Sequence, residues 1–276
     1  MGKLILVSTP IGNLGDITLR ARQALAEADA VAAEDTRRTL QLLNHLGIKK
    51  PLISFHAHST EEKCEALIRR IQAGETIAYV SDAGTPCIAD PGTELVAAAR
   101  REGVEVTALP GPSAALCALM LSGMDASRFL FEGFLPGGKP KRRQRIAWLL
   151  NQGVTCVLYE SPHRLAETLD MLQNLEPDRV ICCCRELTKL HEEVISASAT
   201  ELAALYREQE PRGEFVLVIE GKEPVREEAD DETRDALLKE LLQSGLDKPA
   251  AARQAAEALG LNRRTLYRRL LELENE

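Results

Sequence analysis

Three loops rich in glycine and proline are the parts of this sequence best suited to hold a ligand. They are residues 8–16 (STPIGNLGD), 81–92 (SDAGTPCIADPG) and 110–114 (PGPSA). Glycine lets a ligand approach the main chain because it has no Cβ, and proline restricts the backbone to one conformation. Each loop alone could be no more than a tight turn after a strand. Three of them in one protein favour a ligand site built largely from main-chain groups.

Three short groups combine acids with bases and could move protons or bind phosphate. They are Glu34-Asp35-x-Arg37, Glu160-x-x-His163-Arg164 and Arg185-Glu186-x-x-Lys189. A carboxylate can accept a proton from a reacting hydroxyl, and an arginine can bind a phosphate through two parallel N–H groups. The same residue types also form ordinary ion pairs and helix caps, so both interpretations remain open for each group.

The segments that must position these residues alternate between short apolar runs and longer amphipathic stretches. Such alternation is typical of βαβ units with a mostly parallel sheet, in which ligands bind at the carboxyl ends of the strands. Ser59-x-x-Glu62 has the spacing of a capping box at a helix start. The predicted strands are residues 4–7, 30–33, 52–55, 77–80 and 104–109, and the predicted helices are residues 17–28, 37–46, 61–73 and 94–102.

A second set of elements and a tail of different composition follow. The second set has predicted strands at residues 129–131, 155–159, 180–184 and 215–219, and predicted helices at 141–150, 165–175 and 200–208. A charged linker at 222–232 precedes three predicted helices at 233–243, 249–259 and 263–273. We therefore expect an α/β protein in three parts. Residues 1–111 and 112–222 are expected to form two α/β domains, and residues 223–276 a linker and a basic helical tail.

Composition and length exclude several classes of protein. The 276 residues carry a net charge of -8, so any contact with nucleic acid must come from local patches. No apolar run approaches the ~20 residues that cross a bilayer, and the N-terminus lacks the pattern of a secretory signal, so we expect no membrane contact. The seven cysteines form no CxxC pair, which favours free thiols in the reducing cytoplasm. The adjacent Cys182, Cys183 and Cys184 are predicted to alternate between the faces of a buried strand.

Two segments partly match known cofactor-binding motifs, but neither has the complete pattern. The first loop has glycines at 12 and 15 only, so it lacks the GxGxxG pattern of dinucleotide sites. Residues 133–140 differ from the phosphate-binding GxxxxGK[ST] motif at Pro140, which stands where a hydroxyl should bind magnesium. Residues 141–145 are then interpreted as a basic loop. No spacing typical of a metal site occurs, and we expect no metal.

Six segments occur together and in order, and they resemble a known family. They are residues 8–17, 32–37 (AAEDTR), 81–92, 110–114, 131–136 (FEGFLP) and 159–164 (YESPHR). The set is similar to the tetrapyrrole-methylase type (class III) of S-adenosylmethionine-dependent methyltransferases. More narrowly, it resembles the branch that methylates the 2′-oxygen of a cytidine in 16S ribosomal RNA. The resemblance spans residues 3–221 and implies two α/β domains with the methyl donor held in the cleft between them, and a homodimer.

The resemblance also implies roles for individual residues. Thr85 stands where the wider family has an aspartate, which implies a hydroxyl contact instead of a carboxylate contact. The motifs do not identify the group that accepts the proton of the ribose hydroxyl. We prefer Asp35 or Glu160, because a nearby carboxylate helps such a weak acid to react. By motif match, the donor contacts Pro10, Ile11, Gly12, Gly84, Thr85, Ile88, Ser113 and Ala114.

Basic side chains predict where RNA would bind. Residues 248–271 of the tail carry six arginine or lysine residues and one glutamate, in a pattern close to a helix-turn-helix. With 16S ribosomal RNA or the small ribosomal subunit as partner, the candidate contacts are Arg37, Lys139, Arg142, Arg143, Arg164, Arg185, Arg263 and Arg264. Three alternatives remain: a methylase of small tetrapyrroles, a DNA-binding regulator with an α/β sensor body, and a tail that is only a stabilising three-helix cap.

Overall fold

The computed structural model describes residues 2–56, 59–222, 231–259 and 263–273, and at residues 231–233, 257 and 263 it describes the main chain alone. Contacts divide the chain into two compact units. One comprises residues 1–149 and 154–221, and the other comprises residues 150–153 and 222–276. The first unit contains two sheets covered by helices, which confirms the predicted α/β class. The division into three parts at residues 111 and 222 stays a prediction about folding units.

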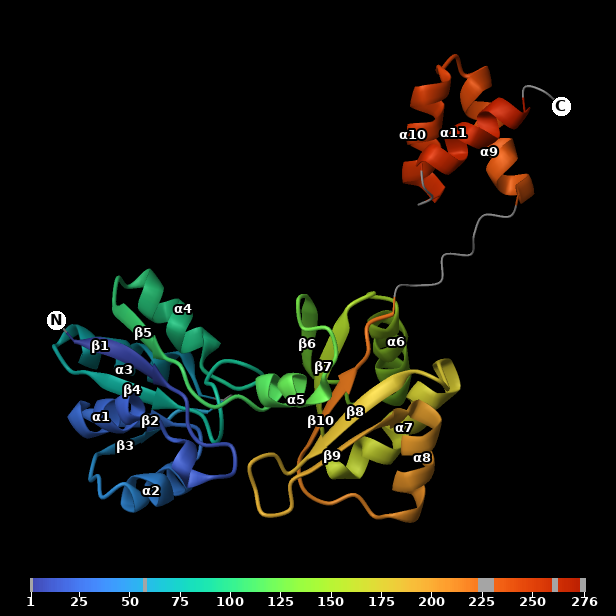
Figure 1. Ribbon diagram of the computed structural model, residues 1–276. Coiled ribbons are helices and arrows are strands. Elements are labelled where there is room, and N and C mark those ends of the chain that lie inside the picture. Colours follow the sequence, from blue (N-terminus) through green and yellow to red (C-terminus); the bar gives the residue numbers. More distant parts are fainter. Residues whose placement is uncertain (1, 57–58, 223–230, 260–262, 274–276) are drawn as a thin grey trace. The chain divides into compact units, whose positions relative to one another are not determined.

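Five strands form the first sheet in the order β3-β2-β4-β1-β5, and every neighbouring pair is parallel. Figure 1 shows these strands with helices on both sides. All nine predicted elements are confirmed, with boundaries that shift by at most two residues. The strands are β1 (Lys3–Val7), β2 (Ala30–Ala33), β3 (Leu52–Ser54), β4 (Ile77–Val80) and β5 (Glu105–Leu109), and the helices are α1 (Leu19–Glu27), α2 (Thr36–His45), α3 (Glu61–Gln72) and α4 (Thr93–Arg101).

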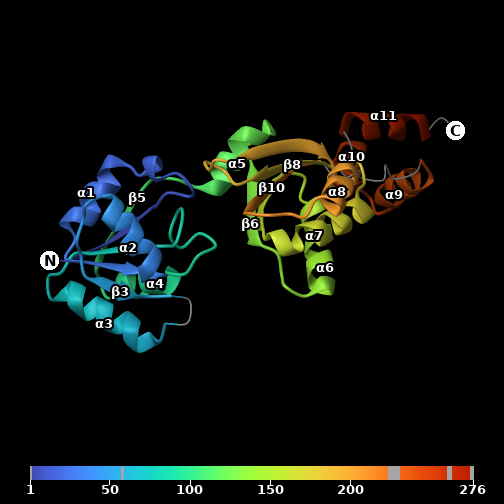
Figure 2. The ribbon, with the colours of Figure 1, turned by 90° about the horizontal axis from the view of Figure 1, so that it is seen from below.

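Alternate residues of these strands belong to two separate cores. Leu4 and Tyr79 pack with α3 and α4, whereas the neighbouring Ile5 and Val80 pack with α1 and α2. A strand buried on both faces needs apolar residues at successive positions, and β2 and β4 are buried along their whole length. Figure 2 shows the same layers in a second orientation. The sheet is therefore fixed on both faces, and the loops at its carboxyl edge have a rigid base.

The second sheet has the order β6-β7-β10-β8-β9 and is mostly antiparallel. Only the β6–β7 pair is parallel. The rings of Tyr206 in α8 and Phe215 in β10 pack edge to face. The strands are β6 (Phe129–Phe134), β7 (Thr155–Glu160), β8 (Val180–Arg185), β9 (Glu193–Ser198) and β10 (Phe215–Ile219), and the helices are α5 (Ala114–Ser122), α6 (Lys139–Leu150), α7 (Pro162–Leu175) and α8 (Ala199–Glu208).

Two elements and two local details differ from the sequence-based prediction. Helix α5 was not expected because it is apolar on all sides and shows no helical period, and β9 is a largely exposed edge strand with little alternation. The predicted capping box at Ser59 is wrong. Thr60 is the N-cap of α3, and the hydroxyl of Ser59 accepts a hydrogen bond from His56 N instead. For residues 141–145 the predicted helix at 141–150 is confirmed, and the other interpretation, a basic loop, is wrong, because those residues lie in α6.

The three adjacent cysteines of β8 are buried and alternate as predicted. Cys182 and Cys184 pack with α5 on one face. The thiol of Cys183 points the other way and lies 3.7 Å from the hydroxyl of Tyr206 in α8. All seven cysteines are free thiols, so these three serve as small apolar side chains.

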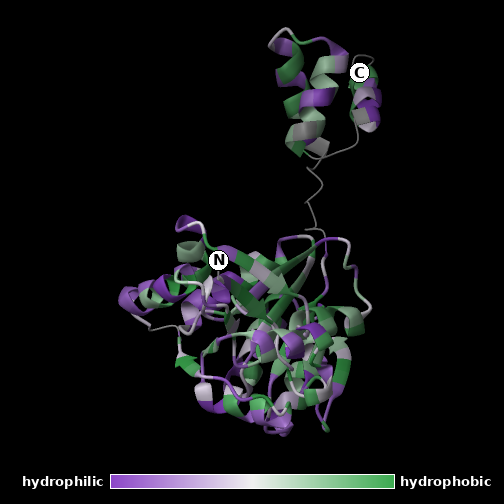
Figure 3. Cartoon of the chain, turned by 90° about the vertical axis from the view of Figure 1, so that its left-hand side faces the viewer, coloured by the Kyte–Doolittle hydropathy of each residue, from purple (hydrophilic) through white to green (hydrophobic). Residues whose placement is uncertain are grey.

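The second unit is built from three helices: α9 (Asp231–Gln243), α10 (Lys248–Leu259) and α11 (Arg263–Leu273). Their apolar core includes Leu238, Ala251, Leu266 and Leu270. Figure 3 shows hydrophilic and hydrophobic residues mixed along each of these helices, as expected when only one stripe is buried. The predicted turn at Gly260 and most of the predicted linker lie outside the described residues. Within the described residues, no helix combines the length and apolar character needed to cross a bilayer.

Candidate functional site

A cavity of about 390 Å³ in the first unit is lined by loops at the carboxyl edge of the first sheet and by residues of the second sheet. Six of the eight residues matched to the donor lie in its wall: Ile11, Gly84, Thr85, Ile88, Ser113 and Ala114. Pro10 and Gly12 flank Ile11 and lie outside the wall. A Cβ on Gly12 would come within 2.4 Å of Lys189 Cγ, so this glycine permits close packing against the loop at residues 187–189.

Hydrogen bonds join the three glycine- and proline-rich loops into one surface. The main chains of Thr9 and Gly84 bond to each other, and the hydroxyl of Thr85 donates to the carbonyl of Pro112 over 3.1 Å. Gly84 has φ of +79°, a left-handed conformation that favours glycine. The loops are therefore held in place independently of any ligand.

The backbone is strained on both sides of Ile88. Its neighbours Cys87 and Ala89 have φ of 69° and 59°, although neither is glycine. The segment is held because the hydroxyl of Tyr79 donates to the carbonyl of Pro91 over 2.8 Å. A Cβ on Gly92 would lie 2.3 Å from the ring of Tyr79. Strained residues are found preferentially at functional sites, where the surrounding structure maintains them.

Three carboxyl groups from neighbouring strand ends line one side of the cavity. Glu34 follows β2, and Asp82 and Asp90 follow β4, which is the neighbour of β2 in the sheet. Burial, and then the charges of Asp82 and Asp90, raise the pKa of Glu34. Burial also raises the pKa of Asp90. Sequence analysis named Glu34 as one member of the Glu34-Asp35-x-Arg37 group and did not propose Asp82 or Asp90, because the adjacency of β2 and β4 cannot be derived from either segment alone.

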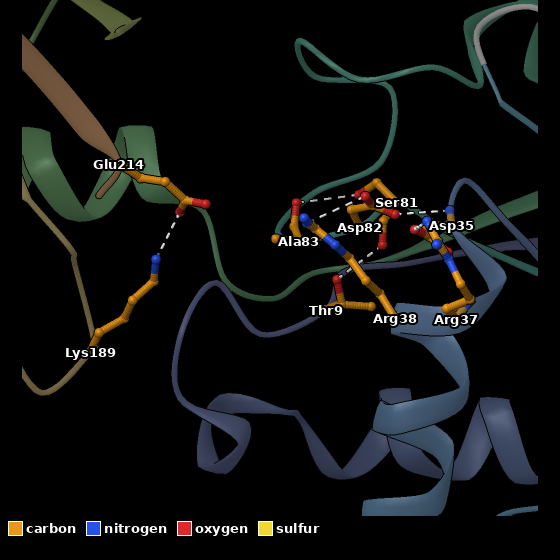
Figure 4. A network of polar contacts seen from close by, with 9 residues as sticks. All are labelled: Thr9, Asp35, Arg37, Arg38, Ser81, Asp82, Ala83, Lys189 and Glu214. Atoms are coloured by element: carbon orange, nitrogen blue, oxygen red, sulfur yellow. Dashed lines mark hydrogen bonds and ion pairs between the residues drawn. The ribbon is translucent and has the colours of Figure 1, made fainter. Parts of the chain in front are cut away.

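Asp82 also holds two neighbouring groups, the main chain of Asp35 and the guanidinium of Arg38. Its Oδ1 accepts a hydrogen bond from Asp35 N over 2.9 Å, and its Oδ2 lies 3.4 Å from Arg38 Nη1. Figure 4 shows Arg38 and the main chain of Asp35 both directed at Asp82. Arg38 lines the cavity too and was not among the sequence-based candidates.

The side chain of Asp35 does not line the cavity. It caps α2 by accepting a 2.8 Å hydrogen bond from Arg37 N, and its carboxylate receives two more bonds from the Arg37 guanidinium. These bonds lower the pKa of Asp35 to about 2. Arg37 itself is 88% exposed. For this pair the structural interpretation, a helix cap with an ion pair, accounts for the contacts.

Glu160 lines the cavity, but both oxygens of its carboxylate already accept hydrogen bonds from the protein. One oxygen accepts from the hydroxyl of Thr168 over 2.6 Å and the other from Ser161 N over 2.8 Å. Arg164 Nε lies 3.4 Å away, and Arg164 Nη2 donates to the carbonyls of Leu135 and Pro136. Glu160 is only 2% exposed. These contacts join the end of β7 to α7 and fix the position of the carboxylate.

The remaining basic candidates differ in exposure. Arg142 is 3% exposed, and its guanidinium bonds Glu167 and the carbonyls of Pro136 and Gly137. Lys139, which pairs with Glu167, and Arg143 are exposed. Arg185 donates to the carbonyl of Arg212. Arg264 is exposed on α11, and the side chain of Arg263 lies outside the described residues.

Lys189 links two glutamates at another part of the site. Lys189 Nζ donates to Glu186 over 2.8 Å and to Glu214 over 3.1 Å, and Glu214 lines the cavity. Figure 4 shows the Lys189–Glu214 contact. Among the described residues, no three His, Cys, Asp or Glu side chains are grouped as a metal ion would require.

Comparisons with known proteins agree with this fold. The chain matches the tetrapyrrole (corrin/porphyrin) methylases over residues 3–203 and the RsmI C-terminal HTH domain over residues 228–274. Solved structures with the same fold include cobalt precorrin-4 methyltransferase, at 17% identity and a TM-score of 0.61 over 79% of this chain and 94% of that chain. Uroporphyrin-III C-methyl transferase from Thermus thermophilus, complexed with S-adenyl homocysteine, is 23% identical with a TM-score of 0.57 over 79% and 97%.

Relatives with higher identity cover almost the whole chain. Ribosomal RNA small subunit methyltransferase I of Synechocystis sp. is 46% identical over 99% of this chain and 99% of its own length. The protein of the same name from Escherichia coli O157:H7 is 43% identical over 98% of this chain and 95% of its own length. The chain therefore belongs to the tetrapyrrole methylase family and, within it, to the ribosomal RNA small subunit methyltransferase I family.

Proposed function

We propose that this protein transfers the methyl group of S-adenosylmethionine to the ribose 2′-oxygen of a cytidine in 16S ribosomal RNA. The observation that carries the proposal is that six residues matched to the donor line one cavity. The names of the full-length relatives support RNA in the small ribosomal subunit as the substrate class. The basic tail supports RNA over a free tetrapyrrole, which would have no use for it.

The cavity suits a cationic donor in size and charge. Its volume of about 390 Å³ is within the range of small-molecule sites. Among the described residues, five carboxyl groups and one guanidinium, that of Arg38, line the cavity. This excess of negative charge complements the positive charge of a sulfonium. The carboxyl groups are those of Glu34, Asp82, Asp90, Glu160 and Glu214.

The reaction needs alignment, exclusion of water and one proton acceptor. When bound, the donor supplies a methyl group on a positively charged sulfur, which is already electrophilic. Holding the ribose oxygen in line with the C–S bond lowers the barrier by several kcal/mol, ~7–11 in ideal cases. The O2′–C bond forms, the C–S bond breaks with its electron pair left on sulfur, and the hydroxyl proton moves to a base.

We assign that base to Glu34 in place of Asp35 or Glu160. Glu34 lines the cavity, and its raised pKa makes it a better proton acceptor than a fully exposed carboxylate. Asp35 is paired with Arg37 outside the wall. Glu160 is held by Thr168 and Ser161, so we interpret it as a positioning residue.

Exposed basic side chains provide the proposed contacts with RNA phosphates. They are Arg264 and Arg268 on α11, Lys139 and Arg143 on α6, and Arg37 on α2. Arg142, Arg164 and Arg185 are left out, because their side chains are buried or half-buried and carbonyl groups of the protein already bind their guanidinium groups.

The exposed apolar surface of α5 supports a homodimer, and the free cysteine thiols support a location in the cytoplasm. Leu116, Met120 and Leu121 of α5 are 52%, 75% and 50% exposed, which is an unusual amount of apolar surface for one helix. The free cysteines suit a reducing compartment. Light scattering of the purified protein tests the dimer, and a monomer at micromolar concentration would contradict it.

A methyl-transfer assay tests the proposed function. Small ribosomal subunits lacking the modification are incubated with labelled S-adenosylmethionine, and the digested RNA is analysed by mass spectrometry. We expect 2′-O-methylcytidine at one position. Label on a base, label on a porphyrinoid offered in parallel, or tight binding to DNA without transfer would each contradict the proposal.

A further inference from the structure

A β-bulge in β6 changes the direction of Phe134. Phe131 lies opposite Val157 and Gly133 lies opposite Leu158, so Glu132 is an extra residue in β6. Gly133 has φ of +71°, and a Cβ there would also lie 3.3 Å from the Cβ of Ala89. Bulges re-aim side chains and are common beside active sites. The bulge therefore depends on glycine at position 133.

The bulge brings two phenylalanines to the same tyrosine. Residues three apart in a regular strand face opposite sides, yet Phe131 and Phe134 both pack edge to face against Tyr159. The ring centroids are 5.2 Å and 5.5 Å from that of Tyr159. Tyr159 is held in turn by packing against the apolar cluster that contains Ala115 and Ala118 of α5. The extra residue, Glu132, forms two 2.7 Å hydrogen bonds with Arg145 of α6.

Phe134 stays exposed in spite of this support. It lines the cavity, and 56% of its surface is accessible. Aromatic residues are only 4% of the chain. A phenylalanine ring that is fixed at a cavity and yet exposed is therefore unusual in this protein. Exposing a phenylalanine forfeits the hydrophobic stabilisation of burial, and a function in binding accounts for that loss.

We propose that Phe134 is the surface on which the base of the target nucleotide stacks. This inference rests on the proposed function. A nucleotide must leave its helical stack before its ribose can enter a cavity, and proteins replace the lost stacking with aromatic side chains. Such a contact is sequence-tolerant and strong, because every base has a flat π face.

The position of Phe134 favours the RNA base over the adenine of the donor. The residues matched to the donor come from loops of the first sheet and the start of α5, whereas Phe134 comes from the second sheet. The carboxyl groups of the wall disfavour a phosphate inside the cavity, so a nucleotide held there is best held by its base. The exposed ring is reachable from solvent, where a nucleotide still joined to RNA must enter.

Three variants test the inference on small ribosomal subunits that lack the modification. Phe134→Ala removes the ring, Phe134→Trp keeps a flat ring, and Phe129→Ala is the matched control. Phe129 is a 41% exposed phenylalanine of the same strand that does not line the cavity. We expect Phe134→Ala to raise the KM for subunits about tenfold, the size of one lost stacking contact. The Kd for S-adenosylmethionine, measured by calorimetry, stays unchanged, and Phe134→Trp and Phe129→Ala behave as the wild type.

A fluorescence measurement reports the stacking directly. Trp148 is the single tryptophan of the chain, so Phe134→Trp combined with Trp148→Phe leaves one reporter at the cavity. We expect its emission to be quenched by subunits and unchanged by S-adenosylmethionine alone. Quenching by the donor, a weaker donor Kd in Phe134→Ala, or an unchanged KM would overturn the inference while leaving the proposed function intact. A wild-type protein without transfer to subunits would overturn both.

Discussion

The main chains of Thr9 and Gly84 hydrogen-bond each other in both directions, over 2.9 Å from Thr9 N and 3.0 Å from Gly84 N. This bridge lies outside the regular strands and joins the loop after β1 to the loop after β4. With the Thr85–Pro112 bond, it makes one wall from three loops that are far apart in the sequence. The surface that we propose binds the donor is therefore expected to be rigid before any ligand binds.

We expect Gly84→Ala to weaken donor binding about tenfold or more, because the new Cβ would lie 3.3 Å from Ile11 Cγ2 in the cavity wall. The left-handed φ adds a strain of ~1–2 kcal/mol. Gly47→Ala is the control, since Gly47 has φ of +69° but a Cβ there would meet nothing within 4 Å. Calorimetry with S-adenosylmethionine separates the two. Equal affinity in both variants would mean that the donor does not contact this loop.

Glu34→Gln is expected to reduce kcat by ~100-fold or more, because a proton acceptor is lost while the shape of the side chain is kept. In the wild type, kcat should rise with pH through the pKa of Glu34, which lies above 4.5, since only the ionised form accepts a proton. That rise should disappear in Glu34→Gln. Asp35→Asn, one residue away and outside the cavity wall, should retain kcat. The opposite pattern would return the role to Asp35.

The Asp35–Arg37 pair should affect stability rather than catalysis, in a pH window set by the carboxylate. The pKa of Asp35 is lowered from 3.8 to about 2 in the folded chain, so the pair stabilises above the unfolded value and is lost as pH falls toward about 2. Urea unfolding of the wild type and Asp35→Asn should differ at about pH 5 and converge at low pH. A difference that does not depend on pH would show that the cap, not the charge, is responsible.

Glu160→Ala should destabilise the first unit by about 1–3 kcal/mol, because it leaves the buried hydroxyl of Thr168 without its hydrogen-bond partner. Denaturant unfolding measures the change. Glu210→Ala is the control, since Glu210 and Arg212 form a pair whose side chains are both 77% exposed, and it should show no measurable change. A stable Glu160→Ala protein with no turnover would instead support a direct role in the reaction.

Replacing Arg264 and Arg268 of α11 by alanine should weaken binding to small subunits and reduce its salt dependence, by about one unit of slope for each lost phosphate contact. Donor affinity should not change. Arg69→Ala is the control, because Arg69 is a 65% exposed arginine on α3 that pairs with Glu65. Equal salt slopes in all three proteins would leave the tail as a stabilising cap.

The amino-acid sequence by itself determined the class, the parallel half of the fold and the loops that contribute much of the cavity wall. Apolar runs such as Ile77–Val80, followed by glycine- and proline-rich loops, identify strands and their carboxyl ends, because both signals are local. Local pattern also predicted the alternation of Cys182 and Cys183, since strand geometry alone imposes it.

Tertiary structure alone decided which side chains face the cavity. Glu34 and Asp35 are adjacent in the chain, yet only Glu34 lines the wall beside Asp82, because β2 and β4 are neighbours and Asp35 caps a helix. Phe134 reaches Tyr159 only because one extra residue in β6 reverses the strand's alternation. Strand order and bulges depend on pairing between distant segments, and a pattern within one segment carries no information about its partner.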